Sequence, residues 1–210
     1  MQKSSTPTIY RQELREKIAA TALKEFRSKG IKGVKMDDIA QSLSISKRTL
    51  YEIYETKEGL LLEVLKQEEE KNKAYLADFA RRVNHNVIDV IMEFYQMKMK
   101  VLSDINPAFL YDLRRSKRLN AFLEKHQKES NSKAVEFYQR GVSQGYFRED
   151  VEFLLIISMC NISITHIMLD RSYKEYNLKT IFRNIIMLLF RGICTEKGVR
   201  EIDKRMKLME

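Results

Sequence analysis

Cationic and hydroxyl-bearing side chains gather at the start of a short predicted helix within residues 36–57, MDDIAQSLSISKRTLYEIYETK. Lys47, Arg48, Thr49 and Tyr51 fall on the outward face of this helix, whereas its apolar residues face inward. Lysine and arginine can contact phosphate or donate to guanine edges, and a threonine methyl can contact a thymine methyl. A helix N-terminus adds free N–H donors and a positive dipole end. The pattern indicates a surface that binds a polyanion.

A shorter helix and a turn precede this helix and would orient it. The inner stripe of the preceding helix has apolar residues at helical spacing, namely Met36, Ile39, Ala40 and Leu43. Ser44-Ile45-Ser46 interrupts the stripe, and Ser46 stands where an N-cap can accept from free backbone N–H groups. The pattern predicts two short helices joined by a turn, an arrangement that can place a helix in the DNA major groove.

Amphipathic helices are predicted on both sides of this pair. Residues 9–28 carry a long apolar stripe that ends before Gly30 and Gly33. Downstream, Thr56 can cap a further helix beginning near Lys57. The inner face of this helix would be Leu60, Leu61, Val64 and Leu65. Three helices and the start of a fourth would therefore enclose one small core in the first third of the chain.

With these flanking elements, residues 18–65 resemble the TetR family of bacterial transcriptional regulators. The resemblance rests on the segments ALKEFRSKG and DDIAQSLSISKRTLYEIYETKEGLLLEVL. It implies an all-α protein with a three-helix helix-turn-helix DNA-binding domain followed by a helical ligand-binding and dimerisation domain. The expected domains are residues 1–57 and 58–210, with a helix over 57–83 connecting them.

The resemblance also implies a DNA-binding surface made of Lys35, Ser46, Lys47, Arg48, Thr49, Tyr51 and Lys57. Ser46 and Lys57 are expected to anchor phosphates, and Tyr51 to reach the backbone or a base. The three residues after Ser46 would face base edges. Lys35 stands where the family often has a threonine that caps the helix and touches phosphate, so the cap is lost and the phosphate contact is kept. Tyr54 is expected in the domain core.

Composition and charge agree with this reading. The 210 residues carry a net charge of +9, and residues 1–57 hold 12 lysines and arginines against 7 aspartates and glutamates. A basic excess favours a polyanionic partner, although it does not separate DNA from RNA or an anionic membrane. Only 7 glycines and 2 prolines occur, and no strand-like alternation stands out, so the chain is expected to be almost entirely helical.

The apolar segment 153–169, FLLIISMCNISITHIML, tests whether the chain crosses a membrane. Asn161 and His166, with several hydroxyl residues, make it a poor span, so no membrane partner is expected. A helix that is apolar all round is otherwise buried on all sides. The resemblance implies a homodimer through helices near 150–170 and 178–195, and two copies would suit a palindromic site in double-stranded DNA. Cys160 and Cys194 are expected to be reduced core thiols of a cytoplasmic protein.

The middle of the chain should form the regulatory body. Helices are expected near residues 86–103, 107–115, 118–142 and 150–170, with Gly141 and Gly145 ending the long one. The residues that could line a pocket for a small, mostly apolar effector are Phe94, Tyr95, Met99, Phe109, Phe122, Tyr138, Met159 and His166. Each is also compatible with plain core packing, and the expectation of a pocket comes from the resemblance.

No catalytic or metal-binding pattern emerges. His85, His126 and His166 lie far apart, and the sequence has no phosphate-binding glycine loop and no paired nucleophile and base. We therefore expect neither metal nor cofactor, and no enzyme. The favoured function is a homodimeric repressor whose effector releases it from DNA. The alternative is a helical protein-interaction module without sequence-specific DNA binding, and an enzyme acting on an apolar ligand ranks third.

Overall fold

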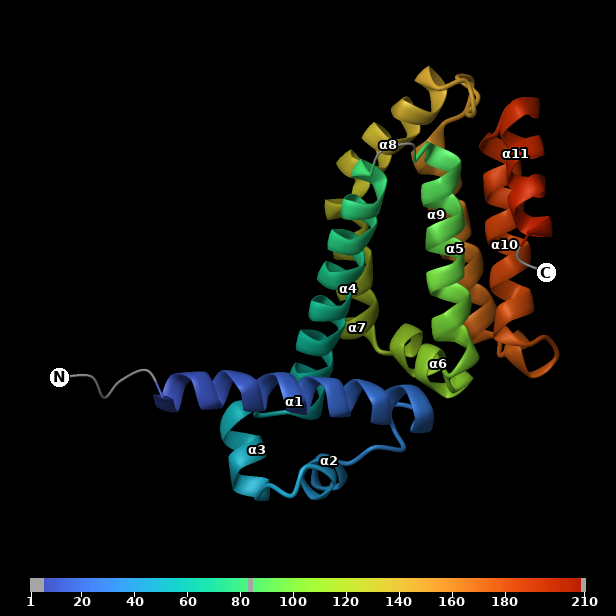
Figure 1. Ribbon diagram of the computed structural model, residues 1–210. Coiled ribbons are helices and arrows are strands. Elements are labelled where there is room, and N and C mark those ends of the chain that lie inside the picture. Colours follow the sequence, from blue (N-terminus) through green and yellow to red (C-terminus); the bar gives the residue numbers. More distant parts are fainter. Residues whose placement is uncertain (1–5, 83–84, 209–210) are drawn as a thin grey trace. The chain divides into compact units, whose positions relative to one another are not determined.

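The computed structural model describes residues 6–82 and 85–208, which are helical apart from short connections (Figure 1). The chain divides into two compact units: residues 1–72 with 105–113, and residues 73–104 with 114–210. Within the described residues the only strand-like pairing is an isolated bridge between Phe147 and Cys194. The all-helical fold class is thereby confirmed. The first unit extends past Lys57, where sequence analysis placed the domain boundary.

The first unit is built from α1 (Thr6–Lys29), α2 (Met36–Ser42), α3 (Lys47–Ile53), the first part of α4 (Lys57–Arg81) and most of α6 (Pro107–Arg115). Its core contains the apolar stripes expected from the sequence. Side chains with no exposed surface come from four helices and are Ile18, Ala22, Phe26, Ile39, Leu50, Leu60 and Leu61. Burying each large apolar side chain contributes about 1.5–3 kcal/mol, so this core suffices to orient α3.

Helix α6 has the bounds expected from the sequence but belongs to the first unit and not to the regulatory body. Asn106, just before it, donates its backbone N–H to Arg27 O at 2.7 Å and its side-chain amide to Ser28 O at 3.2 Å. Asp112 accepts from the backbone N–H of Lys32 at 3.1 Å. The two Asn106 bonds satisfy carbonyls that the end of α1 leaves without helical partners, and with the Asp112 bond they fix α6 against the end of α1.

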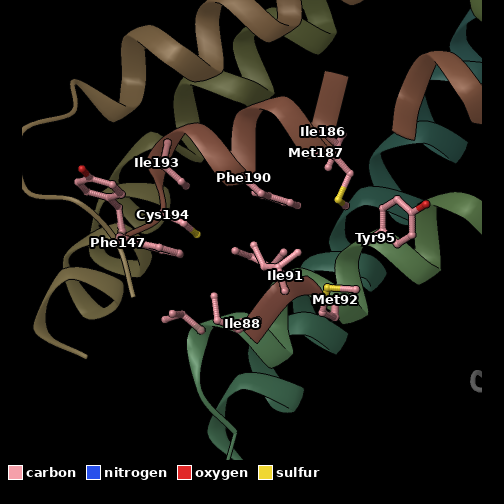
Figure 2. Packing of buried hydrophobic residues seen from close by; sticks show 13 residues of the cluster. Ile88, Ile91, Met92, Tyr95, Phe147, Ile186, Met187, Phe190, Ile193 and Cys194 are labelled. Atoms are coloured by element: carbon pink, nitrogen blue, oxygen red, sulfur yellow. The ribbon is translucent and has the colours of Figure 1, made fainter. Parts of the chain in front are cut away.

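The second unit contains α5 (Val87–Ser103), α7 (Lys117–Glu129), α8 (Asn131–Ser143), α9 (Phe153–Leu169), a short 3₁₀ helix (Ser172–Lys174), α10 (Leu178–Ile193) and α11 (Glu196–Lys207). Helix α5 packs against α8, α10 and α11, and α9 packs against α8 and α10. Figure 2 shows the core, in which residues of α5 face residues of α10 and Phe147 closes one end. The labelled members from α5 and α10 are Ile88, Ile91, Met92, Tyr95, Ile186, Met187, Phe190 and Ile193.

Two expectations about the second unit were wrong. The single helix expected over residues 118–142 is two helices that meet at Ser130. The Ser130 hydroxyl and backbone N–H both donate to His126 O, at 2.8 and 3.2 Å, and such back-bonding bends a helix. Gly141 does not end α8 but lies inside it, and a glycine is required there because a Cβ would come within 1.9 Å of the Phe147 ring. Gly145, at φ +72°, follows the helix end as expected. Helix α11 was not expected.

The buried Cys194 gives a chemical check on the second unit. Burial raises the pKa of its thiol from 9.0 to about 11. Since the thiolate is the reactive form, we expect iodoacetamide at pH 8 to alkylate Cys194 about 100-fold more slowly than an ordinary thiol. Mass spectrometry of a time course would measure this rate, with the protein in denaturant as the reference. Equal rates in the folded and the unfolded protein would contradict the buried position.

Candidate DNA-binding surface

The turn between α2 and α3 sets the angle at which α3 leaves the core. Ser44 adopts φ 53°, in the left-handed region, and the backbone N–H of Ile45 donates to Ala40 O at 3.0 Å. Non-glycine residues seldom adopt this conformation, so the turn is specified by the packing on both sides. Leu50, with no exposed surface, anchors α3 in the core. Figure 1 shows α2 and α3 as two short helices joined by this turn.

The outward face of α3 carries the side chains expected to bind DNA. Lys47, Arg48 and Tyr51 are exposed, and Thr49 is half-buried. Tyr54 lies in the core with 5% of its surface exposed, as expected, and the Arg15 guanidinium lies 5.0 Å from the centre of its ring. The surface therefore offers two cations and a phenol to a ligand, together with the N-terminal backbone of α3.

Ser46 is the N-cap of α3, which confirms that part of the expectation. Its hydroxyl oxygen accepts from the backbone N–H of Thr49 at 3.0 Å and lies 2.8 Å from the Thr49 hydroxyl. The hydroxyl is thus already used inside the protein, and a phosphate anchored here would be bound mainly by the backbone N–H groups of the first turn. The phosphate contact itself remains a prediction.

Replacing Ser46 by alanine tests the cap. We expect the free energy of unfolding to fall by about 1 kcal/mol, because a backbone N–H of α3 loses its acceptor. Chemical denaturation followed by circular dichroism would measure the change. Ser42→Ala, at an exposed residue near the end of α2, is the control and should change stability by less than about 0.5 kcal/mol. Equal stability of Ser46→Ala and the wild type would contradict the capping role.

Lys57 is placed differently from a simple phosphate anchor. Its ammonium donates to Ile31 O and Val34 O, both at 2.9 Å, and so ties the loop between α1 and α2 to the start of α4. One of its three protons remains for a phosphate. Lys35 is exposed and makes no side-chain cap, as expected; its backbone N–H donates to Asp38 at 3.0 Å. Thr56 caps α4 by accepting from Gly59 N at 3.0 Å.

Three charged residues that sequence analysis did not single out lie at this surface. Asp37 of α2 pairs with Lys47, and Glu52 of α3 accepts from Arg48 Nε at 2.8 Å. Arg11 of α1 donates to Glu52 O at 3.3 Å, near the carboxyl end of α3. The spacing of Arg48 and Glu52, four residues apart on a helix, could have been seen in the sequence. The other two contacts depend on tertiary structure.

The expected effector-binding residues are not brought together as one set. Tyr95 and Tyr138 are buried in the core cluster of the second unit, with Phe94 and Met99 packed against it. Phe122 packs on His126 of its own helix, with ring centres 4.3 Å apart. In the other unit, Phe109 is buried. Within the described residues, no group of three histidine, cysteine, aspartate or glutamate side chains could hold a metal ion.

The structure contradicts the expectation that Met159 and His166 line an effector pocket. Both are exposed on α9, Met159 with 54% of its surface, so neither side chain faces the interior of the second unit. The sequence could not show this, because α9 is apolar on every face and its spacing does not mark an inner side. The four residues that remain together, Phe94, Tyr95, Met99 and Tyr138, come from α5 and α8.

Helix α9 and its neighbour α10 expose an unusual amount of apolar surface. The exposed fractions are 59% for Leu155, 54% for Met159 and 65% for Ile162 on α9, and 76% for Leu188 on α10. We refer to these four residues as the α9–α10 face. In the part of the chain that the structure describes, no helix is both long and apolar enough to cross a membrane. Exposed apolar side chains that gather on neighbouring helices are typical of interaction sites.

Comparison with known proteins agrees with this geometry. The family model for the bacterial regulatory proteins of the TetR family matches residues 18–64, which run from the middle of α1 into α4. The chain is 32% identical over 97 residues to IcaR, the HTH-type negative transcriptional regulator of the biofilm operon icaADBC of Staphylococcus epidermidis. That match covers 46% of this chain and only 50% of IcaR.

Two further similarities extend over more of the chain. It is 29% identical over 171 residues to the HTH-type transcriptional repressor KstR2 of Mycolicibacterium smegmatis, covering 72% of this chain and 74% of KstR2. The fold is shared with the transcriptional regulator FadR of Bacillus subtilis, solved in complex with stearoyl-CoA. In that comparison the TM-score is 0.62 at 14% identity, over 85% of this chain and 98% of FadR.

Proposed function

We propose that this chain is a member of the TetR family of bacterial regulatory proteins and acts as a cytoplasmic homodimeric repressor that binds a palindromic DNA operator. The observation that carries the proposal is the geometry of α3. Its N-terminus is capped by Ser46, Leu50 is anchored in the core, and two cations stand on the outward face. A helix presented in this way can enter the major groove and read base edges.

Each protein group would have a separate task on DNA. The backbone N–H groups at the start of α3 and the exposed Lys35 would hold phosphates, which fixes position without reading sequence. Arg48 and Thr49 would contact base edges, and Tyr51 would reach the backbone or a base. Lys57 would contact phosphate with its remaining proton while holding the loop between α1 and α2. The repressor names of IcaR and KstR2 support the negative sign of regulation.

A second copy of the chain is the proposed occupant of the α9–α10 face. A single α3 helix contacts only a few base pairs, so specific binding needs two copies related by a two-fold axis. The exposed leucines and isoleucine of this face supply the apolar surface that obligate homodimers bury. Because α9 and α10 pack on each other within one copy, two copies would form a four-helix arrangement.

The proposed effector is small and mostly apolar. The aromatic residues that support it lie on α5 and α10: the ring centre of Phe182 on α10 is 6.4 Å from that of Phe94 and 6.4 Å from that of Tyr95, both on α5. Methionines such as Met99 beside them can adjust to an apolar guest. Stearoyl-CoA, the ligand of the FadR structure, combines an apolar chain with a polar head, and it supports an effector of this general kind.

The deciding experiment is a selection of random double-stranded DNA on the purified protein, followed by sequencing. Recovery of a palindrome would support a dimeric repressor and would supply an operator for effector screens. Absence of enrichment from folded, effector-free protein would count against DNA binding and favour the protein-interaction module. An Arg48→Met variant should alter the selected sequence, whereas Lys35→Met should weaken binding to every sequence about equally.

A further inference from the structure

The two cations on the outward face of α3 are each held by a carboxylate. Lys47 pairs with Asp37, and Arg48 Nε donates to Glu52 Oε1 at 2.8 Å. The side chains of Arg48 and Glu52 are 88% and 57% exposed, so this pair lies on the face that would meet DNA. The hydrogen bond to Asp37 raises the pKa of Lys47, in agreement with a lysine paired to a carboxylate. Both positive charges are therefore balanced before any nucleic acid arrives.

The net charge of the whole helix-turn-helix also shows that its cations are balanced by carboxylates. Residues 36–55 contain two cations, Lys47 and Arg48, against four carboxylates, Asp37, Asp38, Glu52 and Glu55, a net charge of −2. Residues 1–57 as a whole carry 12 basic against 7 acidic side chains. The basic excess of residues 1–57 thus lies outside the segment that reads bases. Attraction to phosphate, which is independent of sequence, comes mainly from those flanking cations.

We propose that Glu52 and Asp37 are specificity-determining residues that discourage α3 from binding DNA through phosphates alone. If Arg48 turned to a phosphate, it would leave Glu52 unpaired beside a polyanion, which is unfavourable. When Arg48 faces guanine, Glu52 can keep its bond to Nε while the terminal nitrogens donate to the base. Asp37 restrains Lys47 in the same way from α2.

This inference rests on the proposed DNA binding and is tested with full-length Glu52→Gln and Glu55→Gln. Both variants remove one negative charge from the same exposed segment, but Glu55 lies beyond the end of α3. Glu52→Gln should bind random duplex DNA about 5- to 10-fold more tightly, with a salt slope steeper by about 0.9 for one further phosphate contact. Its affinity for the selected operator should change less than about 2-fold, so discrimination falls. Glu55→Gln should change both affinities less than about 2-fold.

A mutant cycle shows whether Glu52 acts through Arg48. In an Arg48→Met background, Glu52→Gln should no longer tighten binding to random DNA, because no guanidinium remains to be released. Asp37→Asn should weaken discrimination in the same direction as Glu52→Gln. Circular dichroism should show unchanged folding, because exposed ion pairs contribute little to stability.

The possible failures are distinguishable. Equal effects of Glu52→Gln and Glu55→Gln would reveal a general charge effect and overturn the inference. Persistence of the Glu52→Gln effect without the Arg48 guanidinium would overturn it too. If the wild type selects a palindrome and Glu52→Gln discriminates the operator from random DNA equally well, the proposed function stands and only this inference is overturned. A wild type that selects no sequence would remove the proposed function itself.

Discussion

Ile162→Asp is expected to make the protein monomeric and to weaken operator binding by more than about 100-fold. Ile162 has 65% of its surface exposed, and it lies on α9 near Leu155 and Met159 of the same face. In a symmetric dimer the same substitution enters the interface twice. Two carboxylates would then lose water without gaining partners, which costs several kcal/mol, while each 1.4 kcal/mol changes the dimerisation constant tenfold.

Analytical ultracentrifugation would give the oligomeric state, and fluorescence anisotropy with a selected operator would give the affinity. Leu208→Asp is the matched control, because Leu208 is 80% exposed at the end of α11, outside the α9–α10 face. This control should remain dimeric and bind DNA like the wild type. A dimeric, operator-binding Ile162→Asp protein would contradict the proposed interface. Retained circular dichroism in both variants would show that folding is not the cause.

Loss of the dimer can be distinguished from damage to α3, because only binding to a palindrome needs two copies of the chain. A monomer retains the α3 surface, so its affinity for random DNA should fall much less than its affinity for a palindrome. If only the affinity for the palindrome were lost, the cause would be loss of the dimer. If the affinities for the palindrome and for random DNA were both lost, the cause would be an unfolded first unit. The ratio of the two affinities is therefore the more informative quantity.

Local patterns were sufficient to predict most helix positions. Pro107 marks the start of α6, and the spacing of Leu60, Leu61 and Val64 marks the inner face of α4. The N-cap at Ser46 could also be predicted, because an N-cap needs only a hydroxyl at the right place before a helix. These features depend on neighbours within a few residues, and such neighbours are visible in any sequence.

Features that depend on distant residues could not be predicted in this way. The assignment of α6 to the first unit depends on Asn106 and Asp112 meeting the end of α1. The exposed position of Met159 depends on which side of α9 packs on α8 and α10. Neither relation leaves a periodic signal. For the same reason Lys57 could be placed at the DNA surface by resemblance, while its two carbonyl partners could not be foreseen.

Lys57→Met is expected to lower the free energy of unfolding of the first unit by about 2–3 kcal/mol, besides weakening DNA binding. The Lys57 ammonium is part-buried and donates to Ile31 O and Val34 O at 2.9 Å. A hydrogen bond from a charged donor contributes about 1.5–3 kcal/mol. Both bonds of Lys57 are only part-buried, so we place their sum at about 2–3 kcal/mol, and methionine fills similar space without donating to either carbonyl. Thermal unfolding should shift down by roughly 5–10 °C.

Lys35→Met is the matched control, because Lys35 is exposed and its side chain makes no cap, so the variant removes the same charge from the same region. It should weaken DNA binding with little change in stability. If Lys57 served only as a phosphate anchor, the two variants would have equal thermal stability and would differ only in affinity. A stability loss confined to Lys57→Met would instead show that this lysine holds the loop between α1 and α2, and hence the position of the reading helix.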